Sequence, residues 1–304
     1  MAVTASMVKE LRQATGSGMM DCKKALVEAN EDMEKAIEVL REKGLSKAAK
    51  KADRIAAEGL VKIAFEDDAK KAAIVEVNSE TDFVAKNAEF IGFVEDLAKI
   101  ALATEDKSIE NFMTLSYKEE GTVTDVLNTK ISKIGENMNV RRFVKCATPG
   151  VVYTGYVHGG GTIGAIVGIE TEATREEVAV VGRDVAMQVA SMNPKFVDET
   201  SIDQEYIAKE KEILTQMVLN EGKKPEMVER IVEGKIKKEL KEVCLVEQKF
   251  VKNGDLTVEQ YVETVAKEVG KAMKVVEMVR YEVGEGIEKK SEDFAAEVAA
   301  QLAK

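Results

Sequence analysis

The residues best suited to act on another molecule stand in a polar stretch that contains Asp82 and Phe83 side by side. A β-branched run over 72–77 precedes this stretch and predicts a strand, and apolar residues at helical spacing over 88–101 predict a helix after it. Phe83 is therefore expected in the connection between them. Because burying a phenylalanine is worth about 1.5–3 kcal/mol, Phe83 either folds back onto its own domain or fits a pocket of a partner.

Groups for covalent chemistry are sparse. The single histidine, His158, rules out a site built from several histidines, and at a strand end a lone histidine is usually satisfied within its own fold or solvated. The glycines at 159–161 resemble an esterase oxyanion segment, but no Gly-x-Ser-x-Gly motif accompanies them, so they predict a hairpin turn. Gly270 and Lys271 lack the upstream glycine of a phosphate-binding loop, so we expect no direct nucleotide binding.

Three carboxylates near the polar stretch, Glu76, Glu80 and Asp82, leave a divalent-cation site open as a minor alternative. A metal-dependent hydrolase is the matching enzyme hypothesis, and metal analysis of the purified chain tests it. The leading interpretation is a protein that is not an enzyme and has no cofactor.

The composition predicts a soluble, ordered and helix-rich protein with more than one domain. Its 304 residues are 45% hydrophobic and 33% charged, with three prolines and no tryptophan. The apolar stretches are too short to cross a bilayer, and the N-terminus lacks the apolar segment of a signal peptide. The three cysteines are far apart in the sequence. We therefore expect a cytoplasmic protein with neither a membrane segment nor a disulfide framework.

The net charge of −11 argues against nucleic acid as the main partner, because phosphate binding needs clustered cations. The basic run from Lys47 to Arg54 is spaced with alanines and predicts a solvated helical linker. An RNA-associated or ribosome-binding protein that uses this run and the N-terminal helices is the main alternative. A steep loss of RNA binding with rising salt would support it.

The N-terminal residues 1–46 predict a small domain of three helices. Thr4 can cap the first helix, Asp21 leads the second, and Gly44 ends the third. A basic linker is expected over 47–58.

Met19 and Met20 follow a glycine-rich turn in this domain, and its small core does not obviously need them. Methionine side chains adapt to many surroundings, so this pair either fills a gap in the bundle or forms an apolar surface for a partner.

Beyond the linker the chain repeats itself, which is the strongest architectural signal in the sequence. The strand-like segment 73–77 matches 165–169, and 122–146 can be laid on 257–281 without a gap. Each copy predicts an α+β unit with a small antiparallel sheet. The first copy has four more residues between its strand and its helix, where Thr81–Val84 stand. Because the second copy closes without them, the fold alone does not demand these residues.

The second copy carries an insertion at about 205–243 with two runs of apolar residues at helical spacing, which predicts a protruding antiparallel hairpin. One helical face is expected to carry Ile213 and Met217. Ser291 can cap a last helix that ends near Leu302. The predicted division of the chain after the linker is a core N-subdomain over 59–147, a core C-subdomain over 148–283 and a C-terminal docking module over 284–304.

Three segments, 11–26, 76–86 and 283–289, resemble the elongation factor Ts family closely. The resemblance covers the full chain. It implies an N-terminal ubiquitin-associated-like helical domain, two related core subdomains and a protruding helical hairpin. It also implies guanine-nucleotide exchange on elongation factor Tu in translation elongation.

Carried over by position, the resemblance assigns Thr81–Val84 to the displacement of magnesium from the partner's nucleotide site. Phe83 would wedge between elements of the partner's nucleotide-binding domain, and Asp82 would disturb the surroundings of the ion. Loss of magnesium removes the main counter-charge on the bound phosphates, so the nucleotide would leave faster.

The resemblance also implies further contacts with the partner. Arg12, Met19, Met20 and Lys23 match positions that contact its nucleotide-binding domain. His158 and its glycine turn match a region that faces another domain of the partner, although the glycine run is looser here than the family pattern.

Overall fold

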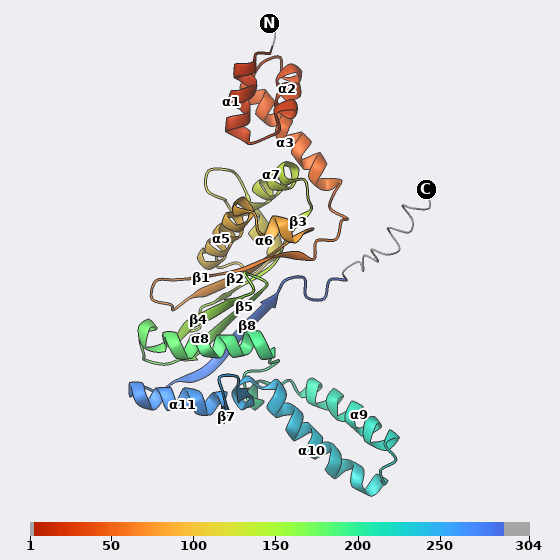
Figure 1. Ribbon diagram of the computed structural model, residues 1–304, viewed down its shortest axis with the longest axis vertical. Coiled ribbons are helices and arrows are strands. Elements are labelled where there is room, and N and C mark those ends of the chain that lie inside the picture. The colour runs from red at the N-terminus through yellow and green to blue at the C-terminus, as the bar shows by residue number, and fades with distance from the viewer. Residues whose placement is uncertain (1–2, 289–304) are drawn as a thin grey trace.

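The computed structural model describes residues 3–288 of the chain. Figure 1 shows an elongated molecule with a helical bundle at one end, two stacked α+β units in the middle and a helical hairpin at the other end. The predicted α+β class, with small antiparallel sheets and a three-helix bundle at the N-terminus, is confirmed.

The N-terminal bundle consists of α1 (Ala5–Thr15), α2 (Met19–Glu28) and α3 (Met33–Ala49). Thr4 caps α1 as predicted, because its side chain accepts a hydrogen bond from the backbone of Met7. Gly16 ends α1 in the left-handed conformation, with φ of 65°. Leu11, Cys22 and Leu26 are fully buried in the small core.

The third helix is longer than predicted. It continues through Gly44 to Ala49, so the first residues of the expected linker are helical. Gly44 is buried, and a Cβ added to it would meet Ser132 at an ordinary contact distance of 3.7 Å. Ala48 is buried in the core of the following unit. This packing offsets the cost of about 1 kcal/mol that glycine imposes on a helix interior.

The first α+β unit has a three-stranded antiparallel sheet in the order β1-β2-β3. The strands are β1 (Glu58–Phe65), β2 (Ala72–Ser79) and β3 (Met138–Cys146). The helices are α4 (Asp82–Ala85), α5 (Ala88–Ala103), α6 (Ile109–Thr114) and α7 (Val123–Ile134). The core between sheet and helices is built on large side chains that include Phe90, Phe93 and Phe112.

The second unit has the corresponding sheet order β4-β5-β8. Its strands are β4 (Val151–His158), β5 (Ile163–Glu170) and β8 (Lys274–Glu282), and its helices are α8 (Arg175–Met192) and α11 (Val258–Val269). Short elements complete it: β6 (Lys249–Phe250), β7 (Asn253–Thr257) and the 3₁₀ turns Glu199–Ser201 and Leu245–Glu247. The glycines at 159–161 form the predicted turn between β4 and β5, all with positive φ.

The internal repeat extends to details of the backbone. Thr122 and Thr257 each form a capping box at the start of α7 and α11, and Gly135 and Gly270 end these helices in the left-handed conformation. Each sheet also has one irregularity in register, between Glu76 and Val77 in the first and at the matching positions 168/169 in the second. The two copies are therefore equivalent units.

The two sheets pack against each other through a separate apolar cluster. Val61 and Ile74 of the first sheet meet Tyr153 and Ile166 of the second. Gly164 permits the close approach, because a Cβ added there would lie 2.5 Å from a methyl carbon of Val61.

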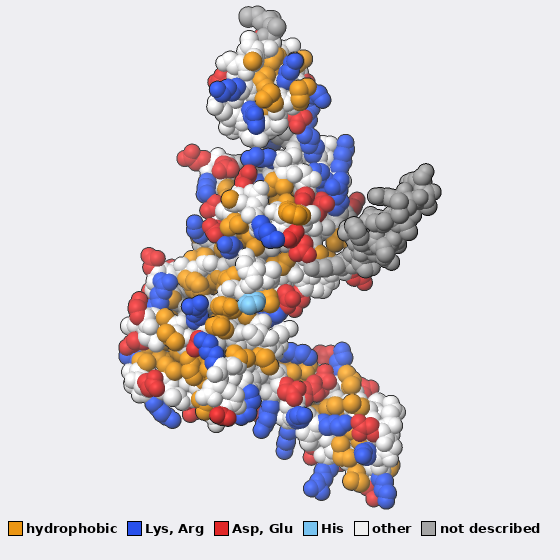
Figure 2. Space-filling view, in the orientation of Figure 1, with side chains coloured by type: hydrophobic (Ala, Val, Ile, Leu, Met, Phe, Trp, Pro, Cys, Tyr) orange, Lys and Arg blue, Asp and Glu red, His pale blue; other side chains and the backbone are white. Residues whose placement is uncertain are grey.

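The insertion forms the predicted hairpin, with α9 (Gln204–Asn220) and α10 (Pro225–Val243). Ile213 and Met217 share one face of α9, and this face is open: the two side chains are 50% and 49% exposed, whereas Leu214 and Val218 pack against α10. Ile213 and Met217 form one apolar stripe along α9, and Leu214 and Val218 form an adjacent one. The second stripe packs with Val228 of α10. Figure 2 shows apolar side chains left open on this hairpin.

The chain leaves β8 through Gly284 and runs past the first sheet. The predicted last helix, from Ser291 to about Leu302, lies outside the described residues. Within residues 3–288, no helix is both long enough and apolar enough to cross a membrane.

Candidate functional site

The Thr81–Val84 segment forms the connection that differs between the two copies. Eight residues (80–87) separate β2 from α5, whereas four (171–174) separate β5 from α8. The additional residues form the single helical turn α4, of four residues. The four extra residues predicted from the repeat therefore form a helical turn, which the first copy adds to the fold that both copies share.

Hydrogen bonds fix the start of this turn. Glu136, which follows α7, accepts one from the backbone N–H of Thr81 at 3.0 Å and one from its hydroxyl at 2.8 Å. The Ser79 hydroxyl donates to the Thr81 carbonyl at 3.0 Å. Hydrogen bonds to an ionised acceptor are about twice as strong as neutral ones. Ser79 and Glu136 thus hold the start of the segment in place.

The apolar residues of α4 differ in burial, because Val84 and Ala85 are buried and Phe83 is not. Val84 is buried in the core of the first unit, whereas Phe83 is 80% exposed, the most of any large apolar side chain described. This exposure decides between the two interpretations of Phe83, because the ring does not fold back onto its own domain. An exposed phenylalanine on a rigid turn is the kind of group that fills a partner's pocket.

Asp82 lies beside Phe83 on the same turn. Its carboxylate accepts a hydrogen bond from the Lys86 ammonium at 2.6 Å, and this bond is the main reason that the pKa of Asp82 lies below its ordinary value. The side chain is about half exposed. The turn therefore presents an ionised carboxylate and an aromatic ring together.

The structure does not bring Glu76, Glu80 and Asp82 together as a metal site. Glu80 accepts a hydrogen bond from the backbone of Asn137, and Glu76 is buried among arginines on the sheet. Across residues 3–288, no cluster of three or more histidine, cysteine, aspartate or glutamate side chains could hold a metal ion.

The residues predicted in the N-terminal bundle are all exposed. Met19 and Met20 are 59% and 63% exposed and form the first turn of α2, which begins two residues before the predicted Asp21 because Gly18 occupies its N-cap position. Lys23 lies one turn further along and lines a surface hollow of about 360 Å³ with Met20. The methionines therefore form an open surface and do not fill the bundle core.

Arg12 is exposed near the end of α1, in the same bundle. His158 is exposed at the end of β4, in the second unit, and its Nδ1 lies 3.0 Å from the Tyr156 hydroxyl. The predicted contact residues thus occupy separate exposed surfaces in three parts of the chain.

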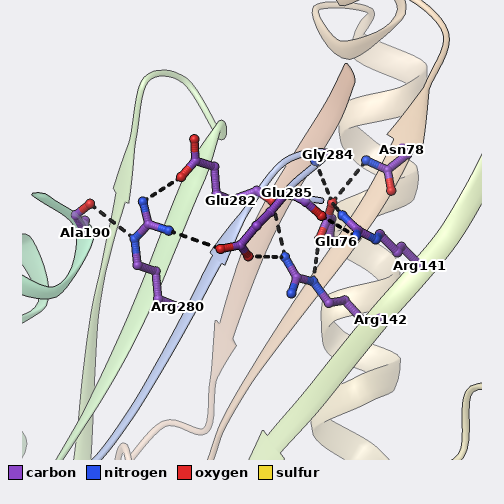
Figure 3. Close-up of polar contacts among 9 residues, drawn as sticks. All are labelled: Glu76, Asn78, Arg141, Arg142, Ala190, Arg280, Glu282, Gly284 and Glu285. Atoms are coloured by element: carbon purple, nitrogen blue, oxygen red, sulfur yellow. Dashed lines mark hydrogen bonds and ion pairs between the residues drawn. The ribbon is translucent and has the colours of Figure 1, made fainter. Parts of the chain in front are cut away.

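Sequence reasoning missed a buried ionic cluster centred on Glu76 (Figure 3). Its carboxylate is fully buried and accepts hydrogen bonds from Arg142 Nε at 2.5 Å and Arg141 Nη1 at 3.1 Å. It also accepts from the Asn78 amide at 3.1 Å and from the backbone N–H of Gly284 at 2.9 Å. The position that matches Glu76 in the second copy is glycine, and this difference was a signal in the sequence.

The cluster ties the chain after β8 to the first sheet. Arg142 pairs with Glu285 at 3.1 Å and lies 4.1 Å from the ring centre of Tyr281. Burial alone raises the pKa of Glu76, but the Gly284 N–H and the Arg142 guanidinium outweigh burial and hold that pKa below its usual range. Glu76 is therefore a buried anion.

Comparison with known proteins shows the family to which the chain belongs. The sequence model of a family described as Elongation factor TS matches residues 80–285. A protein named Elongation factor Ts from Clostridioides difficile is 60% identical to this chain, and the match covers 99% of both. Relatives with the same name from Clostridium tetani and Clostridium botulinum (strain Eklund 17B / Type B) are 53% and 51% identical, each over 99% of this chain and 99% and 100% of their own. The chain belongs to the elongation factor Ts family.

Membership of the elongation factor Ts family gives the chain a role as a nucleotide exchange factor in translation elongation. It also implies elongation factor Tu as the partner. The matched region begins at Glu80, beside the Thr81–Val84 segment, and ends at Glu285, in the ionic cluster.

Proposed function

We propose that this chain accelerates the release of GDP from elongation factor Tu, so that GTP can bind, and that Thr81–Val84 disturbs the partner's magnesium site. The observation that carries the proposal is the exposure of Phe83, at 80%, on a turn that Val84 and Glu136 hold in place. A rigid turn loses little conformational entropy on binding, so more of its contact energy remains for changing the partner.

In this mechanism Phe83 enters the partner's nucleotide-binding domain and Asp82 acts beside it. A negative charge brought close to the magnesium ligands competes for the ion or for the groups that orient it. Because the ion balances the charge of the nucleotide phosphates, its displacement weakens nucleotide binding. By linkage, bound nucleotide weakens the affinity for this chain by the same factor.

The energy required indicates that the turn does not act alone. A thousandfold faster release needs about 4 kcal/mol, since each tenfold step is worth about 1.4 kcal/mol. One buried phenylalanine supplies about 1.5–3 kcal/mol. We therefore assign further contacts to Arg12, Met19, Met20 and Lys23 of the bundle, to His158, and to the module over 284–304.

The chain performs no covalent chemistry in this proposal. It needs no cofactor, binds no nucleotide directly, and works in the cytoplasm away from membranes. The RNA-binding alternative is less well supported, because acidic groups neutralise part of the basic run. Lys47 pairs with Asp21 at 2.9 Å, and Arg54 lies 3.6 Å from Glu80.

Release of a fluorescent GDP analogue from elongation factor Tu in a stopped-flow instrument tests the proposal. Phe83→Ala should slow the release catalysed by the chain about 30-fold, which corresponds to a hot-spot loss of about 2 kcal/mol. Val180→Ala is the matched control, because Val180 is another exposed apolar residue, 70% exposed, on α8. Release at the wild-type rate with Phe83→Ala would contradict the proposal.

A further inference from the structure

The ionic cluster fixes the point at which the chain leaves the second sheet. Val283 donates a backbone hydrogen bond to Thr162 at 2.9 Å, and Gly284 donates to Glu76 at 2.9 Å. Gly284 has φ of 71°, and a Cβ there would lie 2.2 Å from the Ala57 carbonyl oxygen, so the position requires glycine. Although β8 belongs to the second unit, the chain after it is held against the first (Figure 3).

A groove begins where this held segment ends. Its volume is about 850 Å³, and Ile287 lines it together with residues from the end of α3, from α7 and from β3. Leu45 and Ile55 line the groove and are exposed, and Ile131 and Met138 form apolar parts of its wall. The first unit thus keeps an open apolar surface beside the exit of the chain.

Cations outnumber acids at the border of the groove. Arg54, Arg141 and Asp53 line it, and Lys50 and Lys51 directly precede the Ala52–Ala56 part of its wall. Arg54 lies 3.6 Å from Glu80 and Arg141 pairs with Glu76, so Lys50 and Lys51 contribute most of the positive charge that a ligand would meet. These residues include the second half of the basic run over 47–54, for which the exchange function provides no role. An apolar groove with cations at its border fits a segment with apolar residues on one side and acidic residues next to them.

The sequence after Ile287 has this pattern. Phe294, Val298 and Leu302 are four residues apart in the sequence, a spacing that would put them on one face if the segment forms a helix. Residues 291–302 contain the acids Glu292, Asp293 and Glu297 and no basic residue. The three residues 288–290 span up to about 10 Å when extended, which is enough to bring this stretch to the groove.

We propose that residues 291–302 dock in this groove in the free chain. The apolar residues of the segment cover Leu45 and Ile55, and its acids face Lys50 and Arg54. If the exchange function holds, a docked segment is withheld from elongation factor Tu until the two proteins meet. Binding the partner then replaces the contact between the segment and the groove by a contact between the segment and elongation factor Tu.

A single tryptophan can test this docking because the chain contains none. In Phe294→Trp we expect a blue-shifted emission and protection from iodide quenching in the free chain, since the ring would be covered. Adding Leu45→Asp or Ile55→Asp should shift the emission to the red and expose the ring to iodide. Both residues are exposed, so neither substitution should unfold the chain. Ile213→Asp, at an exposed apolar position on the hairpin, is the control that should leave the emission unchanged.

Three results would overturn the proposal. The first is emission typical of a fully solvated tryptophan in the free chain. The second is a blue shift that survives both groove substitutions, which would place the segment elsewhere. The third is a blue shift that disappears on dilution, which would make a second copy the occupant. The measurement contains no elongation factor Tu, so its failure is distinguishable from a failure of the exchange function.

Discussion

Replacing Glu76 by glutamine should lower the free energy of unfolding of the chain. The carboxylate is fully buried and holds two arginines and the Gly284 N–H. Glutamine has nearly the same shape and keeps one acceptor, so the substitution removes the negative charge without leaving a cavity. It leaves Arg141 and Arg142 facing a neutral group.

The expected loss in unfolding free energy depends on how exposed the two arginines are to solvent. Removing one member of a fully buried ion pair costs about 3–5 kcal/mol. The Arg141 and Arg142 side chains are 25% and 30% exposed, so solvent compensates part of the charge and we expect a loss of about 2–3 kcal/mol. The Gly284 N–H should also exchange its hydrogen faster, because its acceptor becomes weaker.

Urea unfolding followed by circular dichroism measures the first effect, and hydrogen exchange at Gly284 measures the second. Glu105→Gln is the matched control, because Glu105 also makes a short ion pair, 2.6 Å from Lys145, but its side chain is 85% exposed. We expect only a small change in that control. The reasoning is refuted if Glu76→Gln loses no more stability than Glu105→Gln.

The effect of Glu76→Gln should depend on pH. Because the folded pKa of Glu76 is lowered, its stabilisation is fully present above the pKa of an unfolded glutamate, about 4.3, and is lost as the pH falls through the folded pKa. The wild type and the variant should therefore converge in stability below this range. A difference that stays constant down to strongly acidic pH would contradict this assignment of charge.

Two further predictions concern the contact with elongation factor Tu. Replacing Met19 and Met20 together by alanine should raise the partner concentration needed for half-maximal exchange while leaving urea unfolding nearly unchanged, because both side chains are more than half exposed. An unchanged titration curve would count against the bundle as a docking surface. Glu136→Gln should lower the maximal exchange rate by a larger factor than it raises the half-maximal concentration, because it weakens the hydrogen bonds that position Thr81. A raised half-maximal concentration with an unchanged maximal rate would show that Glu136 serves binding alone.

The sequence predicted those features of the fold that depend on local pattern. The capping threonines, the glycine helix ends and the two related units were accessible because each leaves a signal within a few residues. The extra turn at Thr81–Val84 was found because the second copy provides an internal reference. The length of α3 was not predicted, because tertiary contacts at Gly44 and Ala48 override a local helix-stop signal.

The candidate site was predictable in position but not in orientation. A linear pattern places Phe83 in a connection, but only the three-dimensional structure shows that Val84 faces the core and Phe83 faces solvent. The ionic cluster was missed because its members are distant in the sequence: Gly284 and Glu76 are 208 positions apart. The open side of α9 was also undetermined, because two adjacent apolar stripes fit the same helical period.

The central claim is that Thr81–Val84 acts on the magnesium site of elongation factor Tu. The most direct measurement is GDP release catalysed by the wild type and by Phe83→Ala, first with magnesium in excess and then after chelation with EDTA. If the segment works by displacing magnesium, the wild type should be much faster than the variant in magnesium, and the two rates should approach each other in EDTA. An advantage of the same size under both conditions would contradict the account.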